Sequence, residues 1–139
     1  MGKWYSTHVD YERDRKEYKK PEHFRVIIAG SRTFKNYDLL EKKCDIIFSN
    51  KKPTSIICGE AAGADTLGKQ YAEKHGIPVE SFPADWEHNG RDAGYMRNIM
   101  MADYADALVA FWNGRSRGTQ HMIDQMRTRE LPIRIIFFN

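Results

Sequence analysis

Short apolar runs alternate with helical patterns along most of the chain. Four runs, at residues 24–29, 55–58, 107–112 and 133–138, are largely apolar and have the length of buried strands, and residues 78–82 are a fifth strand candidate. Strands with so little polar alternation are typical of a parallel sheet that helices cover on both faces. The pattern therefore predicts an α/β domain with a mainly parallel, five-stranded sheet.

The first two helical patterns carry apolar residues three and four positions apart, as one buried helix face requires. In the first, the apolar stripe consists of Leu40, Cys44, Ile47 and Phe48. Glu41 follows Asp38 at the spacing of a capping box, which predicts that Asp38 caps this helix. In the second, the buried face consists of Ala64, Leu67, Gly68, Tyr71, Ala72 and His75. Gly76 is a suitable residue to end it.

The third helical pattern covers residues 92–104, and we expect Met96, Ile99 and Met100 to face inward. The fourth follows the loop at residues 113–119 and is apolar at Met122, Ile123 and Met126. Right-handed crossovers through these helices give a doubly wound, Rossmann-like three-layer αβα sandwich, for which we favour the strand order 3-2-1-4-5. We assign residues 24–139 to this domain and residues 1–23 to a charged N-terminal extension.

Composition narrows the classes of function. The net charge of +3 over 139 residues is mild, and no basic and aromatic stripe is present, which argues against a nucleic-acid partner. Cys44 and Cys58 belong to no Cys/His cluster, so we expect no structural zinc and reduced thiols, as in a cytoplasmic protein. No apolar run approaches the length of a membrane span.

Three loops rich in small residues follow the first, second and fourth strands, at residues 30–33, 59–65 and 113–119. In a doubly wound sheet these loops converge at the switch point between strands 1 and 4, where ligands bind. Glycines allow close approach of the backbone, and free N–H groups at a helix start favour an anion. Neither a Walker A loop nor GxGxxG is present, which disfavours ordinary ATPases and NAD dehydrogenases. The loops predict a phosphate- or nucleotide-sized ligand.

Four segments in this order, RVIIAGSR (25–32), CGEAAGAD (58–65), AGYMRN (93–98) and FWNGRSRGT (111–119), resemble the YspA-type branch of the SLOG superfamily. The resemblance covers about residues 24–139 and implies a Rossmann-like fold with a nucleotide-type ligand over the three loops. The superfamily includes the DNA-processing protein DprA, the LOG nucleotide-monophosphate phosphoribohydrolases, and sensor domains for signals derived from NAD or ADP-ribose. Members are often oligomeric, so the resemblance also implies a homo-oligomer.

The candidate ligand-binding residues come from the three loops and from the region between strands 3 and 4. They are Gly30, Ser31, Arg32, Gly59, Glu60, Gly63, Asp65, Asp85, Trp86, Arg97, Asn113, Gly114, Ser116, Gly118 and Thr119. The resemblance makes Arg32 a phosphate or ribose contact and gives Arg97 a place in the site. Asp65 either caps the following helix or accepts from ribose hydroxyls. Trp86 either stacks on a base or covers the sheet edge.

One departure from the resemblance concerns catalysis. Gly118-Thr119 looks like part of the PGGxGTxxE segment of LOG enzymes, but Met122 stands where that segment has the catalytic glutamate. A thioether cannot serve as a general acid or base, which disfavours LOG-type hydrolysis of an N-glycosidic bond. Asp124 and Glu60 are the nearest carboxylates, and His121 stays a candidate.

We therefore expect a nonenzymatic binder that senses or sequesters a nucleotide-derived small molecule, such as a cyclic or ADP-ribose-like signal, without a cofactor or metal. The alternative is a hydrolase or transferase acting on a glycosidic or phosphoester bond, with Glu60, Asp65 and Asp85 as candidate carboxylates. Single-stranded DNA binding, by analogy with DprA, is disfavoured by the modest charge. The choice between binder and enzyme stays open at this point.

Overall fold

The computed structural model describes residues 23–139, so the predicted extension lies outside the described residues except for His23. Its five strands are β1 (Arg25–Gly30), β2 (Ser55–Cys58), β3 (Val79–Ser81), β4 (Ala107–Trp112) and β5 (Ile133–Phe137). Every neighbouring pair is parallel, and the order is β3-β2-β1-β4-β5. The predicted α/β fold and strand order are confirmed.

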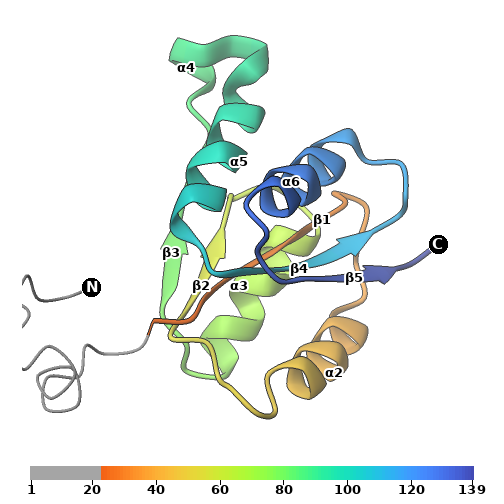
Figure 1. Cartoon of the computed structure of the whole chain (residues 1–139). Helices are drawn as coiled ribbons and strands as arrows, with labels where there is room; N and C mark the ends of the chain where they lie inside the picture. Colours follow the sequence, from red (N-terminus) through yellow and green to blue (C-terminus); the bar gives the residue numbers. More distant parts are fainter. Residues whose placement is uncertain (1–22) are drawn as a thin grey trace, which may run out of the picture.

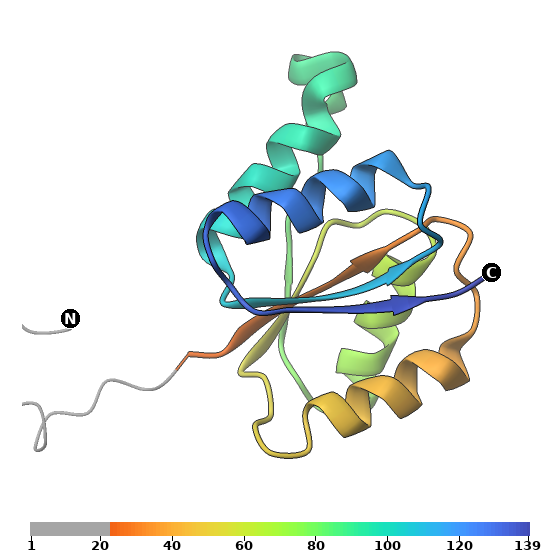
Figure 2. The same ribbon diagram turned by 45° about the vertical axis from the view of Figure 1, so that its right-hand side comes forward.

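Helices cover both faces of the sheet (Figures 1 and 2). The helices α2 (Tyr37–Ile47) and α3 (Ala64–Lys74) lie on one face, and α5 (Ala93–Tyr104) and α6 (Arg117–Thr128) on the other. The short helices α4 (Trp86–Asn89) and η1 (Gly90–Asp92) precede α5. Among the described residues, no helix has the length and apolar character that crossing a bilayer requires.

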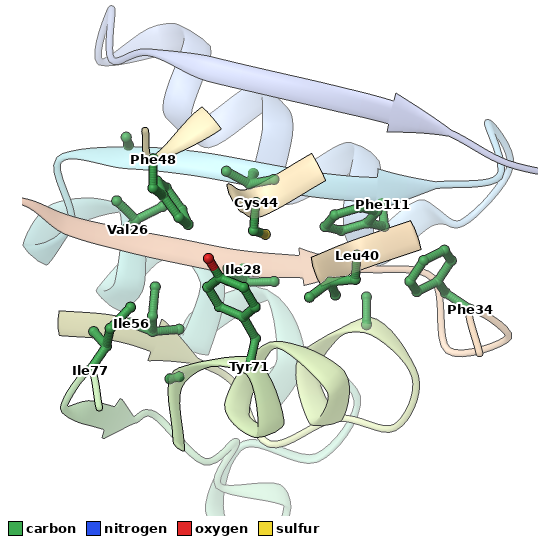
Figure 3. Close-up of a cluster of buried hydrophobic side chains, with 14 residues drawn as sticks. Val26, Ile28, Phe34, Leu40, Cys44, Phe48, Ile56, Tyr71, Ile77 and Phe111 are labelled. Carbon is green, nitrogen blue, oxygen red and sulfur yellow. The ribbon is translucent and has the colours of Figure 1, made fainter. Parts of the chain in front are cut away.

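The sheet has a hydrophobic core on each face. Successive side chains of the central strands point into these two cores alternately, as strand geometry requires. Val26 and Ile28 pack against α2 and α3 in the cluster of Figure 3, while Ile27 packs against α5 and α6. All three are fully buried, and each contributes roughly 1.5–3 kcal/mol by leaving water. The sheet is therefore a rigid base for the loops at its carboxyl edge.

The predicted cap of the first helix is wrong. Asn36 caps α2, because its Oδ1 accepts from the Leu39 N–H at 3.0 Å, and Asp38 lies inside the first turn. At the helix start Glu41 accepts from the Tyr37 hydroxyl at 3.4 Å, which is not the backbone contact of a capping box. Its carboxylate instead pairs with Lys74 at 2.7 Å and His75 at 2.9 Å, which joins α2 to α3.

The predicted inward face of the third helix is also wrong. Met96, Ile99 and Met100 are exposed on α5, and the buried residues are Ala93, Asn98, Met101 and Ala102. Two alanines allow the helix to approach the sheet closely, and the Asn98 side chain donates to the Gly118 carbonyl of α6 at 3.1 Å. This packing turns the larger apolar face of α5 outward.

Candidate functional site

Ser31 ties the three predicted loops together at the carboxyl edge of the sheet. Its N–H donates to the Phe111 carbonyl at 2.9 Å, and its hydroxyl oxygen accepts from the Asn113 N–H at 3.1 Å. Its carbonyl accepts from the Ala64 N–H at the start of α3, at 3.3 Å. The buried Ser31 side chain therefore has a place in the loop framework rather than an open path to a ligand.

Two of the glycines are required by this framework. A Cβ on Gly30 would lie 2.0 Å from the Phe111 carbonyl oxygen. Gly63 has a φ of +77°, and its Cβ would lie 2.4 Å from the Ser31 carbonyl oxygen. Both positions exclude a side chain, so the packing of the chain itself accounts for them.

A pocket of about 250 Å³ opens where the loops meet α5 and α6. Its apolar lining includes Ala29 of β1, Met101 of α5 and Met122 of α6. The polar residues of its lining are Arg32, Asp65, Arg91, Arg97, Asn98, Ser116 and Thr119. A second pocket of about 300 Å³ shares Arg32, Ala61, Trp86 and Arg97 with the first. We name the two together the edge pocket.

Arg97 is half-buried in the wall between the two parts of the edge pocket. One guanidinium nitrogen donates to the Gly59 carbonyl, and Nε donates to Asn98 Oδ1 at 3.1 Å. A Cβ on Gly59 would lie 2.6 Å from the guanidinium, so this glycine makes room for the arginine. Burial lowers the pKa of Arg97, while the nearby Asp65 raises it. The Arg97 guanidinium is thus held in place by neutral acceptors, and its positive charge is available to an anion.

Asp65 is the buried carboxyl group of the pocket, with 5% of its surface exposed. Its Oδ2 accepts from the N–H groups of Gly59 at 3.2 Å and Ala61 at 3.3 Å. Burial raises the pKa of Asp65 to about 6, against the opposing effects of the Ala61 N–H and Arg97. The carboxyl group fixes the loop after β2 in place and does not cap α3, so the predicted cap is wrong, while the contact with ribose hydroxyls stays a prediction.

The start of α6 forms another wall of the pocket. Asn113 Oδ1 accepts from the N–H groups of Arg115 and Ser116, at 2.8 and 2.9 Å, and so shapes the preceding turn. Ser116 caps the helix by accepting from the Thr119 N–H at 3.4 Å. The first N–H groups of a helix have no intrahelical partner. A Cβ on Gly118 would meet nothing within 4 Å, so protein packing does not require this glycine.

The structure brings ten of the predicted residues to the edge pocket. They are Gly30, Arg32, Gly59, Glu60, Asp65, Trp86, Arg97, Ser116, Gly118 and Thr119. The other five, Ser31, Gly63, Asp85, Asn113 and Gly114, line neither part of it. Asp85 instead caps α4 by accepting from the His88 N–H at 3.2 Å, and it pairs with the His88 ring at 2.9 Å.

Sequence reasoning missed Arg91, Gly94, Tyr95 and Asn98 as lining residues. The four-residue helix α4 and the adjoining η1 place Arg91 there, and no periodic pattern reveals elements so short. Asn98 is buried, and a polar residue inside a helical pattern was the available signal. The His121 ring stacks on Tyr95 with centroids 4.3 Å apart, and its Nδ1 lies 3.2 Å from Asn98 Nδ2.

Comparison with known proteins gives two findings. Residues 24–88 match the family described as YAcAr: YspA, cpYpsA-related SLOG family. The chain is also similar to the Gene 61 protein of Mycobacterium phage D29, with 33% identity over 116 residues, which covers 78% of this chain and 93% of the phage protein. No solved structure matches the chain.

Proposed function

The chain belongs to the YspA, cpYpsA-related SLOG family, and on this basis we propose that it binds a nucleotide-derived small molecule in the edge pocket. One observation carries the proposal. Arg32 and Arg97 meet the start of α6 beside an apolar lining of Ala29, Met101 and Met122. Arginines and helix N-terminal N–H groups suit phosphate, and an apolar surface suits a base or ribose face.

The arrangement of carboxyl groups favours binding over hydrolysis. Met122 is buried in the lining, at the position where LOG enzymes carry their glutamate. Asp65 already accepts from two backbone N–H groups, and Asp85 is engaged by His88 outside the pocket. Neither carboxylate is placed as a free general acid or base. We therefore favour sensing or sequestration without a covalent step.

Glu60 favours the alternative, a hydrolase or transferase acting on a glycosidic or phosphoester bond. It lines the part of the edge pocket next to β2, and its φ of +61° is uncommon for a residue with a side chain. Strained backbone of this kind gathers at functional sites. Conversion of a nucleotide by the wild type that disappears in Glu60→Gln, with binding retained, would establish this alternative.

The proposal extends to ligand, location and assembly. A cyclic or ADP-ribose-like signal combines phosphate with apolar surfaces, as the pocket does, and similarity to a phage protein is consistent with sequestration of such a signal. Cys44 and Cys58 are free and buried, which suits the cytoplasm. We propose a homo-oligomer and no nucleic-acid partner.

Titration calorimetry with ADP-ribose, cyclic ADP-ribose, NAD and AMP tests the proposal. Arg32 is exposed and has no side-chain hydrogen bond or ion pair among the described residues, so Arg32→Ala removes a ligand contact without disturbing the fold. Arg127→Ala, at the other end of α6, is the matched control. We expect Arg32→Ala to weaken binding at least tenfold, since a charge-assisted hydrogen bond contributes about 1.5–3 kcal/mol. Equal binding by both variants would contradict this site.

A further inference from the structure

The side-chain amide of Asn98 joins the two long helices that line the edge pocket. Asn98 is buried in α5, with 6% of its surface exposed. Its Oδ1 accepts from Arg97 Nε at 3.1 Å, and its Nδ2 donates to the Gly118 carbonyl at the start of α6, also at 3.1 Å. The same Nδ2 lies 3.2 Å from Nδ1 of His121, further along α6. One amide group therefore meets three groups in or beside the edge pocket.

The partners of Asn98 fix which way its amide points. An arginine guanidinium can only donate a hydrogen bond, and a backbone carbonyl can only accept one. A flipped amide would oppose donor to donor at Arg97 and acceptor to acceptor at Gly118. Of the two Nδ2 hydrogens, one goes to the Gly118 carbonyl and the other points to His121 Nδ1. Asn98 thus has no hydrogen left to donate to an anion.

The His121 ring has an amide donor on each side. On the side away from Asn98, Gln125 Nε2 lies 3.4 Å from His121 Nε2. Gln125 Oε1 accepts from Arg129 at 2.8 Å, which fixes the direction of this amide as well. A neutral ring accepts at one nitrogen, and the shorter contact, to Asn98, favours Nδ1 as the acceptor. A second proton would oppose N–H to N–H at both nitrogens, so these contacts favour the neutral ring.

The charged groups around His121 do not reverse this preference. Burial lowers the pKa of His121, and the carboxylate of Asp124 on the same helix raises it. Arg115 and Arg117 line the same surface hollow as His121 and disfavour a further positive charge. The ring stacks on Tyr95, and both of its nitrogens face amide groups. His121 therefore supports Tyr95, which lines the edge pocket, and exchanges no proton with a ligand.

The guanidinium of Arg97 is held from two sides, by the Gly59 carbonyl of the loop after β2 and by Asn98 Oδ1. Without Asn98, Arg97 Nε has no acceptor among the described residues, and the long side chain gains rotational freedom. A guanidinium that is already fixed binds phosphate without this ordering cost. Asn98 can therefore strengthen anion binding through Arg97, although it has no donor of its own to offer.

From these contacts we propose that Asn98 is a positioning residue of the edge pocket, which holds the Arg97 guanidinium ready for a phosphate group and keeps the His121 ring neutral with its proton on Nε2. The role toward Arg97 rests on the proposed function, since it requires a phosphate-bearing ligand in the edge pocket. The role toward His121 is a property of the protein without ligand. The two roles are therefore tested separately.

NMR of the His121 ring nitrogens in the ligand-free full chain tests the second role. We expect the proton on Nε2 in the wild type. Asn98→Asp keeps the size of the side chain but places a carboxylate oxygen opposite Nδ1, so we expect the proton on Nδ1 and a raised His121 pKa. Gln125→Ala, on the other side of the ring, should leave the proton on Nε2. A wild-type proton on Nδ1, or a tautomer that Asn98→Asp leaves unchanged, would overturn the proposal.

A double-mutant cycle with AMP and adenosine tests the first role by calorimetry. We expect Asn98→Ala to weaken AMP binding about tenfold. Adenosine binding should stay the same, because adenosine offers Arg97 no phosphate. In an Arg97→Ala background the change at Asn98 should have no further effect, because Asn98 acts through Arg97. Gln125→Ala is the control and should bind AMP like the wild type.

Equal losses for AMP and adenosine, or losses that add in the double variant, would overturn the positioning role. If Asn98→Ala does not fold, Asn98→Ser takes its place in the cycle, with the same expectations. A wild type that binds neither AMP nor adenosine would contradict the proposed function instead, and the tautomer of His121 would then decide the role of Asn98.

Discussion

The variant Gly118→Ala tests whether this glycine is required by a bound ligand or by the packing of the protein itself. The new Cβ meets nothing within 4 Å, so no atom of the protein has to move. Alanine is favoured over glycine in a helix by up to about 1 kcal/mol, and Gly118 is the second residue of α6. We therefore expect the free energy of unfolding to stay the same or to rise by up to about 1 kcal/mol.

Ligand affinity is expected to change in the opposite direction. A methyl group at Gly118 occupies space beside the first N–H groups of α6, where an anion would approach. Loss of one charge-assisted hydrogen bond corresponds to about 1.5–3 kcal/mol, which raises the dissociation constant roughly 10- to 150-fold. Urea denaturation measures the stability, and titration calorimetry with the tightest-binding nucleotide measures the affinity.

Gly63→Ala is the matched control for the same chemical change. Its backbone conformation alone costs about 1–3 kcal/mol for a residue with a side chain. The clash with the Ser31 carbonyl oxygen at 2.4 Å adds to this, so we expect clear destabilisation. Undiminished affinity in Gly118→Ala, or a loss of stability like that of Gly63→Ala, would refute the assignment of Gly118 to a ligand.

Three more variants address the pocket. Burial raises the pKa of Asp65 to about 6, above its ordinary 3.8; the stability that this group contributes is greatest below pH 4 and falls by roughly 3 kcal/mol as pH rises through 6. Urea denaturation across this range should show the fall relative to Asp65→Asn, and parallel curves would contradict it. Arg97→Lys keeps the charge but replaces the planar guanidinium, which donates from two nitrogens to Gly59 and Asn98, with a single ammonium; calorimetry should show at least tenfold weaker binding, and unchanged binding would show that the guanidinium geometry is not required. Asp85→Ala removes the α4 cap at a cost of about 1 kcal/mol; amide exchange in α4 should quicken while affinity holds, and a large loss of affinity would place Asp85 in the site.

The strands and the convergence of the loops could be predicted because they depend on local pattern and on a topological rule. Apolar runs such as residues 107–112 indicate buried strands. Parallel strands bring their carboxyl ends to one edge of the sheet, so the loops that follow them meet there. The role of Ser31 could not be predicted, because its partners Phe111 and Asn113 lie some 80 residues away in the chain. Asp65, likewise, looks the same in sequence whether it binds a loop or a ribose.

The prediction of which side of α5 is buried was wrong for a different reason. Hydrophobic periodicity assumes that the most apolar helix face is the buried one. In α5 the buried side is made of Ala93, Ala102, Met101 and a hydrogen-bonded Asn98, and the larger apolar residues face outward. Periodicity cannot distinguish a surface that packs on the same chain from one that packs on another molecule.

Native mass spectrometry of the full chain with the nucleotide panel shows whether the edge pocket holds a nucleotide-derived molecule. We expect one phosphate-bearing molecule per chain, recovered chemically unchanged after denaturation and absent from Arg32→Ala. Recovery of a converted product would contradict the nonenzymatic binder. A chain that holds none of these molecules, with no difference between the wild type and Arg32→Ala, would contradict a nucleotide site in the edge pocket.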